Sequence, residues 1–282
     1  MPHMTPRHWP APAKLNLFLH VVGRRADGYH LLQTVFQFLD YGDRLRFSPR
    51  DDGAIRRVTP IEGIPEEQDL TVRAAAVLQE VAGVSRGVDI AIEKHLPLGA
   101  GLGGGSSDAA TTLVALNRLW GLGLSRERLA ELGLRLGADV PVFIFGRAAW
   151  AEGVGERLTP LDLAEPWYLV LVPLCHVSTA EIFAAPELTR NAPPLKIAAF
   201  LSGAGTNLCE PVVRRRYPEV GEALDWLGKH APARMSGTGA SVFAAFRREA
   251  EAREVLAQVP GRWQARVARG MNVSPLYIAS GE

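Results

Sequence analysis

The sequence predicts an α+β protein of two domains, and three observations lead to this prediction. The chain has 282 residues, which is long for one compact core and suits two domains. Apolar residues make up 47% of the chain, enough to form a core. Predicted strands and helices follow one another along the sequence, and their pattern changes near residue 156. We therefore expect an N-terminal domain at 1–155 and a C-terminal domain at 156–282.

The N-terminal half opens with a predicted strand at 13–23. Its apolar residues alternate with Lys14 and Asn16, which puts these two polar side chains on the same face. Asp27 and Gly28 after the strand are typical of a turn. The other elements expected in this half are strands at 31–40, 44–48 and 88–93, helices at 69–82, 106–120 and 126–137, and a buried strand within 138–146.

Serines mark the expected starts of two of these helices. Either Ser106 or Ser107 is expected to cap the helix at 106–120, and Ser125 the helix at 126–137. A serine hydroxyl at such a position accepts a hydrogen bond from an unpaired amide of the first turn. Gly137 can end the second of these helices.

Strands and helices also alternate in the C-terminal half, as in a small α+β domain with a split βαβ arrangement. A loop that reaches Phe183 is expected after its first strand. A glycine-containing turn, MSGTGAS, occupies 235–241. The expected elements are strands at 168–174, 242–246 and 263–269, and helices near 208–228 and at 248–259.

Composition argues against several classes of protein. The formal charge of +1 at pH 7 leaves no basic surplus for binding nucleic acid. Cys175 and Cys209 form no CxxC pattern, so a structural zinc site is unsupported and reduced thiols are expected. The most apolar runs are too short to span a membrane, and the N-terminus is unlike a signal peptide. We therefore expect a cytoplasmic protein without nucleic-acid or membrane partners.

The stretch PLGAGLGGGSSDAA, at 97–110, contains five glycines directly before a predicted helix. Small residues at a helix start leave backbone N–H groups unshielded, and the helix dipole adds positive charge at the same place. This combination binds phosphate. A flexible surface loop is the alternative, but it would not require so many glycines against a helix start. We interpret residues 97–107 as a phosphate-binding loop.

Known types of phosphate loop do not fit this stretch well. Residues 99–104 match GxGxxG, but Pro97 interrupts the approach that a dinucleotide-binding strand would need. A helix, around Glu127, lies where such a site needs a strand that ends in an acidic residue. No Lys-Ser or Lys-Thr follows the glycines as in a Walker A loop, and no HRD or DFG of a protein kinase occurs. If the loop binds ATP, further charges must come from other segments.

Four segments resemble the small-molecule kinase superfamily named for galactokinase, homoserine kinase, mevalonate kinase and phosphomevalonate kinase. They are "PAKLNLFLHVVGRRADGYHLLQTVFQFLDYGD" at 12–43, "GLGGGSSDAA" at 101–110, "LGADVPVF" at 136–143 and "MSGTGASVFA" at 235–244. Within the superfamily, the chain resembles the kinases that act on 4-diphosphocytidyl-2-C-methyl-D-erythritol. The residue Asp69 departs from this family, where an asparagine is expected near the nucleotide base.

The resemblance implies a fold and an activity. It implies an N-terminal domain of the ribosomal-protein-S5-domain-2-like type, a ferredoxin-like C-terminal domain, and an active site in the cleft between them. The activity is ATP-dependent phosphorylation of the substrate's 2-hydroxyl group, a step of non-mevalonate isoprenoid biosynthesis. ATP and Mg²⁺ are the implied co-substrate and metal ion, and a monomer or weak homodimer is expected.

The resemblance also implies roles for individual residues. Asp139 would orient or deprotonate the acceptor hydroxyl. Lys14 would be the partner of Asp139, keeping that carboxylate ionised and offsetting charge on the γ-phosphoryl group. Ser106 or Ser107 is a candidate Mg²⁺ ligand through the nucleotide. The implied ATP-binding residues are Pro97, Gly99, Gly101, Leu102, Gly103, Gly104, Gly105, Ser106 and Ser107, and the implied substrate-binding residues are Asn16, Tyr29, His30, Phe183, Gly237 and Thr238.

Each role has a simpler structural alternative. Asp139 could cap a turn, Lys14 could face solvent, and Phe183 could belong to the core. Three other functions also remain open: a kinase acting on mevalonate or homoserine, a nicotinamide-dependent oxidoreductase, and a nucleotide-binding module without catalysis. The implied set of Tyr29, His30 and Phe183 favours a substrate that carries a base, because mevalonate and homoserine have no base to stack.

Overall fold

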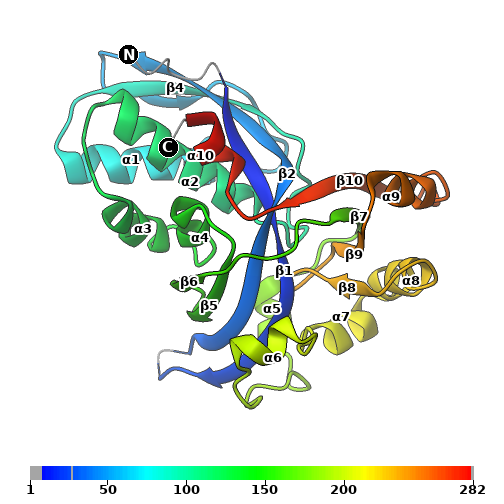
Figure 1. Cartoon of the computed structure of the whole chain (residues 1–282). Helices are drawn as coiled ribbons and strands as arrows, with labels where there is room; N and C mark the ends of the chain where they lie inside the picture. The colour runs from blue at the N-terminus through cyan, green and yellow to red at the C-terminus, as the bar shows by residue number, and fades with distance from the viewer. Residues whose placement is uncertain (1–7, 27, 281–282) are drawn as a thin grey trace.

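Two long antiparallel strands, β1 (Trp9–Arg24) and β2 (His30–Arg50), form the spine of the molecule (Figure 1). The computed structural model describes residues 8–26 and 28–280. Asp27 of the predicted turn, and the first seven residues used in the signal-peptide argument, lie outside these residues. No helix of the described part is both long and apolar enough to cross a membrane.

Eight further strands and eleven helices complete the described part of the chain. The strands are β3 (Ile55–Arg57), β4 (Gly87–Glu93), β5 (Ala149–Gly153), β6 (Arg157–Pro160), β7 (Trp167–Pro173), β8 (Ala233–Met235), β9 (Val242–Phe246) and β10 (Trp263–Met271). The helices are η1 (Glu66–Gln68), α1 (Leu70–Ala82), α2 (Gly104–Leu119), α3 (Arg126–Leu134), α4 (Val140–Phe145), α5 (Thr179–Ala184), α6 (Ile197–Leu201), α7 (Glu210–Arg216), α8 (Pro218–Leu227), α9 (Glu249–Leu256) and α10 (Pro275–Ser280).

The β2 strand is continuous where the sequence predicted two strands with a break between them. The expected strands at 31–40 and 44–48 are joined through Gly42, which pairs with Pro12 of β1. A Cβ atom on Gly42 would lie 2.2 Å from the carbonyl oxygen of Ala11, so only glycine permits this close approach. The uninterrupted strand can therefore pair with β1, β4, β5 and β10.

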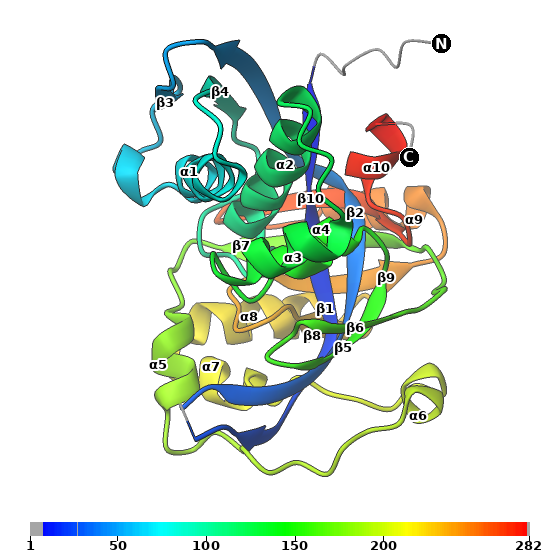
Figure 2. The ribbon, with the colours of Figure 1, turned by 90° about the vertical axis from the view of Figure 1, so that its left-hand side faces the viewer.

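The helices of the N-terminal half, α1 to α4, cover one side of its sheet (Figures 1 and 2). Their apolar faces meet Phe36, Phe38 and Ile90 of the strands in one buried cluster. The Asp69 side chain caps α1 by accepting a hydrogen bond from the amide of Thr71. The predicted cap of α3 is confirmed, since the Ser125 side chain accepts from the amide of Arg128.

The C-terminal half contains a four-stranded antiparallel sheet in the order β10-β7-β9-β8. The helices α7, α8 and α9 pack against it and enclose a second buried cluster. The end of β10 then joins the sheet of the first half, where Gly270 and Met271 pair with β2. Beyond it, Leu276 and Tyr277 of α10 belong to the buried cluster of the N-terminal half. The chain thus returns to its first half at its end (Figure 1).

The segment after Asp139 is a helix, α4, and the predicted buried strand is wrong. Its residues Val140 to Ile144 are all buried, so no alternation between polar and apolar residues could distinguish strand from helix. The helix has Pro141 in its first turn, where the missing amide proton costs nothing. Gly146, with φ at 75°, ends it in the left-handed conformation.

The expected serine cap of α2 is also wrong. The helix begins at Gly104, and its N-cap is Gly103, with φ at 74°. Ser106 and Ser107 therefore lie inside the first turn and cannot cap it. No side chain of the described residues caps this helix, which leaves its first amides available to a ligand.

Candidate active site

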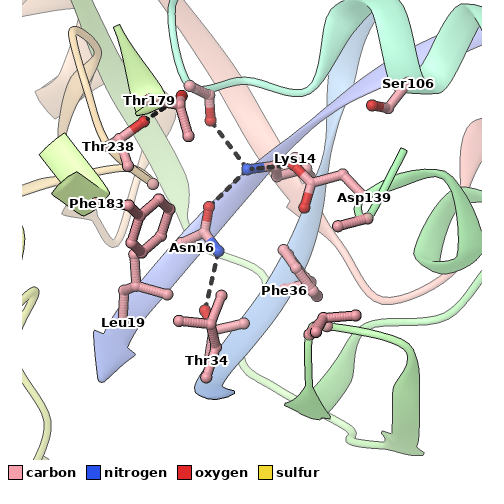
Figure 3. Close-up of a pocket in the computed structure, with 16 residues that line it drawn as sticks. Lys14, Asn16, Leu19, Thr34, Phe36, Ser106, Asp139, Thr179, Phe183 and Thr238 are labelled. Carbon is pink, nitrogen blue, oxygen red and sulfur yellow. Dashed lines mark hydrogen bonds and ion pairs between the residues drawn. The ribbon is translucent and has the colours of Figure 1, made fainter. Parts of the chain in front are cut away.

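A cavity of about 290 Å³ lies between the two halves (Figure 3). We call it the central cavity, and its wall includes Lys14, Gly101 and Asp139 from the N-terminal half. Thr179 and Thr238 enter the wall from the C-terminal half. Residues from both halves therefore face the same space.

The glycine-rich loop reaches this cavity with its backbone. Gly99, Gly101 and Gly103 have φ angles of 65°, 75° and 74°. Left-handed residues alternating with ordinary ones turn successive amides toward one side and form an anion-binding concavity. The loop leads directly into α2, a helix of 16 residues whose uncapped N-terminus adds positive potential. The backbone of this segment is thus arranged to bind phosphate.

A second glycine turn, at 235–241, supports the loop from the other half. The amide of Ser241 donates to the carbonyl oxygen of Ala100 at 3.0 Å, and the Ser236 hydroxyl donates to that of Gly101 at 3.1 Å. A Cβ atom on Gly101 would lie 2.5 Å from the carbonyl oxygen of Ser236. The close packing of the two turns holds the loop in place.

Replacing Gly101 by alanine should destabilise the protein by about 1–3 kcal/mol more than replacing Gly121 by alanine. Both glycines have positive φ angles and share the backbone penalty of about 1–2 kcal/mol. Only Gly101 has backbone atoms where the new methyl group would lie, while Gly121 has open space there. Urea unfolding of both variants measures the difference. Equal losses would show that the loop is not held by these contacts.

Lys14 projects from β1 beneath the loop and is 3% exposed. Its ammonium group donates to Asn16 Oδ1 at 2.6 Å and to the carbonyl oxygen of Gly101 at 3.1 Å (Figure 3). The same Nζ atom lies 3.3 Å from Asp139 Oδ2. The simpler alternative for Lys14, a side chain that faces bulk solvent, is therefore wrong. Its charge lies between the phosphate loop and the Asp139 carboxylate.

Asp139 precedes α4, but its side chain makes no capping hydrogen bond. The carboxylate instead points into the central cavity and is 36% exposed (Figure 3). Its contact with Lys14 holds it on the cavity side. A partly exposed carboxylate beside a buried ammonium group can receive the hydroxyl of a small molecule.

Asn16 and the second glycine turn complete this side of the cavity. The Asn16 amide donates to Thr34 Oγ1 at 2.9 Å, so its orientation is fixed from both ends. Gly237 lies beside it, since an added Cβ atom would be 3.3 Å from Asn16 Oδ1. The hydroxyl groups of Thr238 and Thr179 are 2.8 Å apart across the cavity wall.

A distal cavity of about 610 Å³ adjoins the central one. Tyr29, His30 and Phe183 line it, as the resemblance implied for a base-binding site. The His30 and Phe183 rings stack with centroids 5.0 Å apart and planes 23° from parallel. Phe183 lies in α5, not in a loop as predicted. The two cavities share the wall residues Leu32, Ala138, Val154, Thr179 and Phe183.

A small cavity of about 100 Å³ lies on the other side of the α2 start. Gly105, Asp69, Lys94 and Asp108 line it. The Asp69 carboxylate has structural contacts, because it caps α1 and pairs with Arg57 at 2.7 Å. Both the small cavity and the central cavity thus border the glycine-rich loop and the start of α2.

Lys94 and Asp108 form a buried charge cluster that the sequence reasoning missed. Lys94 Nζ lies 2.5 Å from Asp43 and 2.9 Å from Asp108. Burial acts to lower the pKa of Lys94, but Asp108 and Asp43 outweigh it and raise the pKa above its ordinary value. Burial raises the pKa of Asp108, with Lys94 acting against that rise. The available signal was the scarcity of lysine, which occurs only four times in the chain.

Some predicted ATP-binding residues lie away from the central cavity. Pro97 and Leu102 line a different hollow, and the Leu102 side chain belongs to a buried cluster between the two halves. Gly99 lies against the imidazole of His176, since an added Cβ atom would be 2.6 Å from His176 Nδ1. Ser107 is fully buried. Only the backbone of these residues could take part in binding.

The structure offers few ligands for a metal ion. No group of three or more His, Cys, Asp or Glu side chains within residues 8–26 and 28–280 could hold one. Ser106 and Asp139 both line the central cavity. Mg²⁺ in nucleotide sites takes one or two protein oxygens and completes its shell with phosphate and water. These two side chains therefore fit an ion that arrives with a nucleotide.

Comparisons with known proteins give consistent similarities. Residues 69–147 match the GHMP kinases N terminal domain, and residues 184–265 match the GHMP kinases C terminal domain. A 4-diphosphocytidyl-2-C-methyl-D-erythritol kinase of Nitrosococcus oceani is 62% identical over 268 residues, covering 95% of this chain and 96% of that protein. A protein of the same name from Pseudomonas paraeruginosa is 61% identical, with 95% of each chain covered.

A solved structure shows the same similarity in three dimensions. A crystal structure of 4-(cytidine 5'-diphospho)-2C-methyl-D-erythritol kinase aligns with a TM-score of 0.82 and 36% sequence identity. The alignment covers 93% of this chain and 98% of that one. The similarity therefore extends over both halves of the chain.

Proposed function

Because the chain belongs to the GHMP kinases, and within them to the 4-diphosphocytidyl-2-C-methyl-D-erythritol kinases, we propose that it phosphorylates the 2-hydroxyl of that substrate. It is an ATP-dependent phosphotransferase. The reaction moves the γ-phosphoryl group of ATP to the acceptor oxygen and releases ADP. The product would be an intermediate of non-mevalonate isoprenoid biosynthesis.

The observation that carries this proposal is the position of Lys14. Its ammonium group contacts the carbonyl oxygen of Gly101 and lies 3.3 Å from Asp139. Phosphoryl transfer depends on alignment and on charge stabilisation around the transferred group. In our proposal the loop amides hold the β- and γ-phosphates, and Lys14 offsets the charge that develops during transfer. Asp139 aligns the 2-hydroxyl or accepts its proton.

The three cavities match the three parts of the two substrates. The small cavity beside Gly105 would receive the nucleoside of ATP, because it adjoins the loop and Lys14 is not part of its wall. The central cavity would hold the reacting groups, and the distal cavity the cytidine. Ser106 would hold Mg²⁺ with the nucleotide, where the ion would neutralise phosphate charge.

ADP release from the purified protein tests this function. We expect release with ATP, Mg²⁺ and 4-diphosphocytidyl-2-C-methyl-D-erythritol, and only background release with mevalonate or homoserine. Release only with mevalonate or homoserine would indicate that the chain acts on the substrate of another kinase of the superfamily. ATP binding without turnover on any of them would favour a module without catalysis. Protection from thermal unfolding by NAD and not by ATP would favour an oxidoreductase.

Replacing Tyr29 by alanine should raise the KM for the cytidyl substrate by about 5- to 100-fold and leave the KM for ATP unchanged. The expected loss corresponds to about 1–3 kcal/mol for one base stacked on an aromatic ring. Steady-state kinetics with each substrate varied in turn measures both values. Tyr29→Phe keeps the ring and should behave nearly as the native protein does. Equal losses for the two substrates would contradict the stacking role.

Expectations about the domains, the localisation and the oligomeric state extend the proposal. We retain the division into domains at 1–155 and 156–282, with α10 of the second packed into the core of the first. We propose that the N-terminal domain is of the ribosomal-protein-S5-domain-2-like type and that the other is ferredoxin-like. The order β10-β7-β9-β8 with α7, α8 and α9 supports the second of these descriptions. We also propose that the enzyme works in the cytoplasm as a monomer or weak homodimer, on a small-molecule substrate.

A further inference from the structure

Arg190 contacts the edge of the His30 imidazole from outside the distal cavity. Arg190 Nε donates to His30 Nε2 at 3.2 Å. Arg190 does not line the cavity, whereas His30 does. Phe183 covers a face of the imidazole ring. The ring nitrogen left for a ligand is therefore Nδ1.

The rest of the Arg190 guanidinium is also engaged. It donates to the carbonyl oxygens of Leu188 at 3.1 Å, Phe183 at 2.8 Å and Ala185 at 2.6 Å. A guanidinium group has five donors in one rigid plane and cannot accept a hydrogen bond. Its position relative to His30 is thus set by three backbone groups of a single segment, 183–188.

This contact determines which nitrogen of His30 carries the proton. Because Arg190 can only donate, Nε2 must accept, and in a neutral imidazole the proton then resides on Nδ1. We propose that Arg190 is a positioning residue that fixes His30 in the Nδ1–H form, so that His30 donates a hydrogen bond to an acceptor atom of the substrate base. The identity of the base rests on the proposed function, but the proton position does not.

Burial and the neighbouring charges favour the neutral form of the His30 ring. Burial lowers its pKa, and the guanidinium groups of Arg190 and Arg24 lower it further. Arg24 reaches it from the end of β1, and Arg190 from the segment after α5. The phenol of Tyr29, the preceding residue, lines the distal cavity together with His30. A neutral Nδ1–H imidazole is a donor at one defined atom across neutral pH.

The variant Arg190→Met separates this role from a merely structural one. Without the guanidinium, neutral His30 can exchange between its two tautomers, and Nδ1 is no longer always a donor. The pKa of His30 should also rise toward its ordinary value of about 6.5. Protonation then puts a proton on both nitrogens and restores the Nδ1–H donor. The KM for the cytidyl substrate should therefore rise about 5- to 10-fold at pH 8 and recover toward pH 6.

Arg216→Met is the matched control. Arg216 also holds the segment 183–188, through two hydrogen bonds to Glu187, but it does not contact His30. Loosening the segment alone would affect both variants alike and would not depend on pH. We expect Arg216→Met and the native protein to show the same KM at pH 6 and pH 8.

Nitrogen NMR of the histidine side chains tests the proposal without any substrate. The pattern of two-bond couplings distinguishes Nδ1–H from Nε2–H, and comparison with His30→Gln identifies the signal among the seven histidines. We expect the Nδ1–H form in the native protein and a mixture in Arg190→Met. An Nε2–H form in the native protein would overturn the proposal even if Arg190→Met failed to fold. A confirmed tautomer with an unchanged KM in Arg190→Met would overturn the role in substrate binding.

If the protein does not turn over the cytidyl substrate, the proposed function fails while the NMR result still decides the proton position. The KM for ATP provides the remaining internal check, since the small cavity lies away from His30. A parallel rise in the KM for ATP in Arg190→Met would indicate general damage and would count against a specific positioning role.

Discussion

Replacing Asp139 by asparagine should lower the turnover number by about 10²–10⁴-fold while ATP binding is retained. The amide keeps the size of the carboxylate but cannot accept the proton of the 2-hydroxyl group. The side chain makes no capping hydrogen bond to α4, so the fold should tolerate the change. Single-turnover kinetics with saturating ATP measures the chemical step, and calorimetry with a non-hydrolysable ATP analogue measures binding.

A matched control for this prediction is Asp162→Asn. Asp162 also pairs with a basic residue, Arg147, but it is 84% exposed and lies outside the central cavity. It should leave both turnover and ATP binding unchanged. A turnover number for Asp139→Asn within about threefold of the native value would remove Asp139 from catalysis, since even modest proton-transfer assistance exceeds that factor.

Replacing Lys14 by methionine should lower the turnover number by about 10²–10³-fold, the usual cost of losing one stabilising group at a developing negative charge. The ammonium group is buried and contacts both the Gly101 carbonyl oxygen and Asp139. Methionine fills the same space without charge. It also leaves Asn16 Oδ1 without its donor, while the Gly101 carbonyl oxygen keeps its bond from the Ser236 hydroxyl, so some loss of stability should accompany the loss of activity.

Circular dichroism melting separates the two effects of the Lys14 substitution. Lys229→Met removes another of the four lysines from an exposed position and should change neither activity nor melting. Native turnover in a folded Lys14→Met protein would contradict the electrostatic role. Loss of activity that is fully explained by unfolding at the assay temperature would contradict it as well.

Local signals in the sequence were sufficient for much of the fold. The helix predicted at 69–82 is α1 at Leu70–Ala82, and Ser125 caps α3 as expected, because both depend on neighbouring residues. The prediction failed at α4, where a short and fully buried segment has no informative period. It also divided β2 at Gly42, where a close approach of β1 and not a turn requires glycine.

The candidate site could be predicted only in part. Period-two alternation placed Lys14 and Asn16 on one face, and the structure shows them hydrogen-bonded. The proximity of Lys14 to Asp139 depends on tertiary packing and was expected only from the resemblance. The contacts of Lys94 with Asp108 and of Arg190 with His30 join distant segments, and no spacing rule could reveal them. The catalytic and binding roles of all these residues stay predictions.

The most direct test is a crystal structure with a non-hydrolysable ATP analogue and 4-diphosphocytidyl-2-C-methyl-D-erythritol bound together. We predict that the γ-phosphate contacts the amides at the start of α2 and the Lys14 ammonium group, with the 2-hydroxyl of the acceptor hydrogen-bonded to Asp139. A triphosphate bound elsewhere, such as the hollow beside Pro97 and Leu102, or an Asp139 carboxylate turned away from the acceptor, would contradict the proposed site.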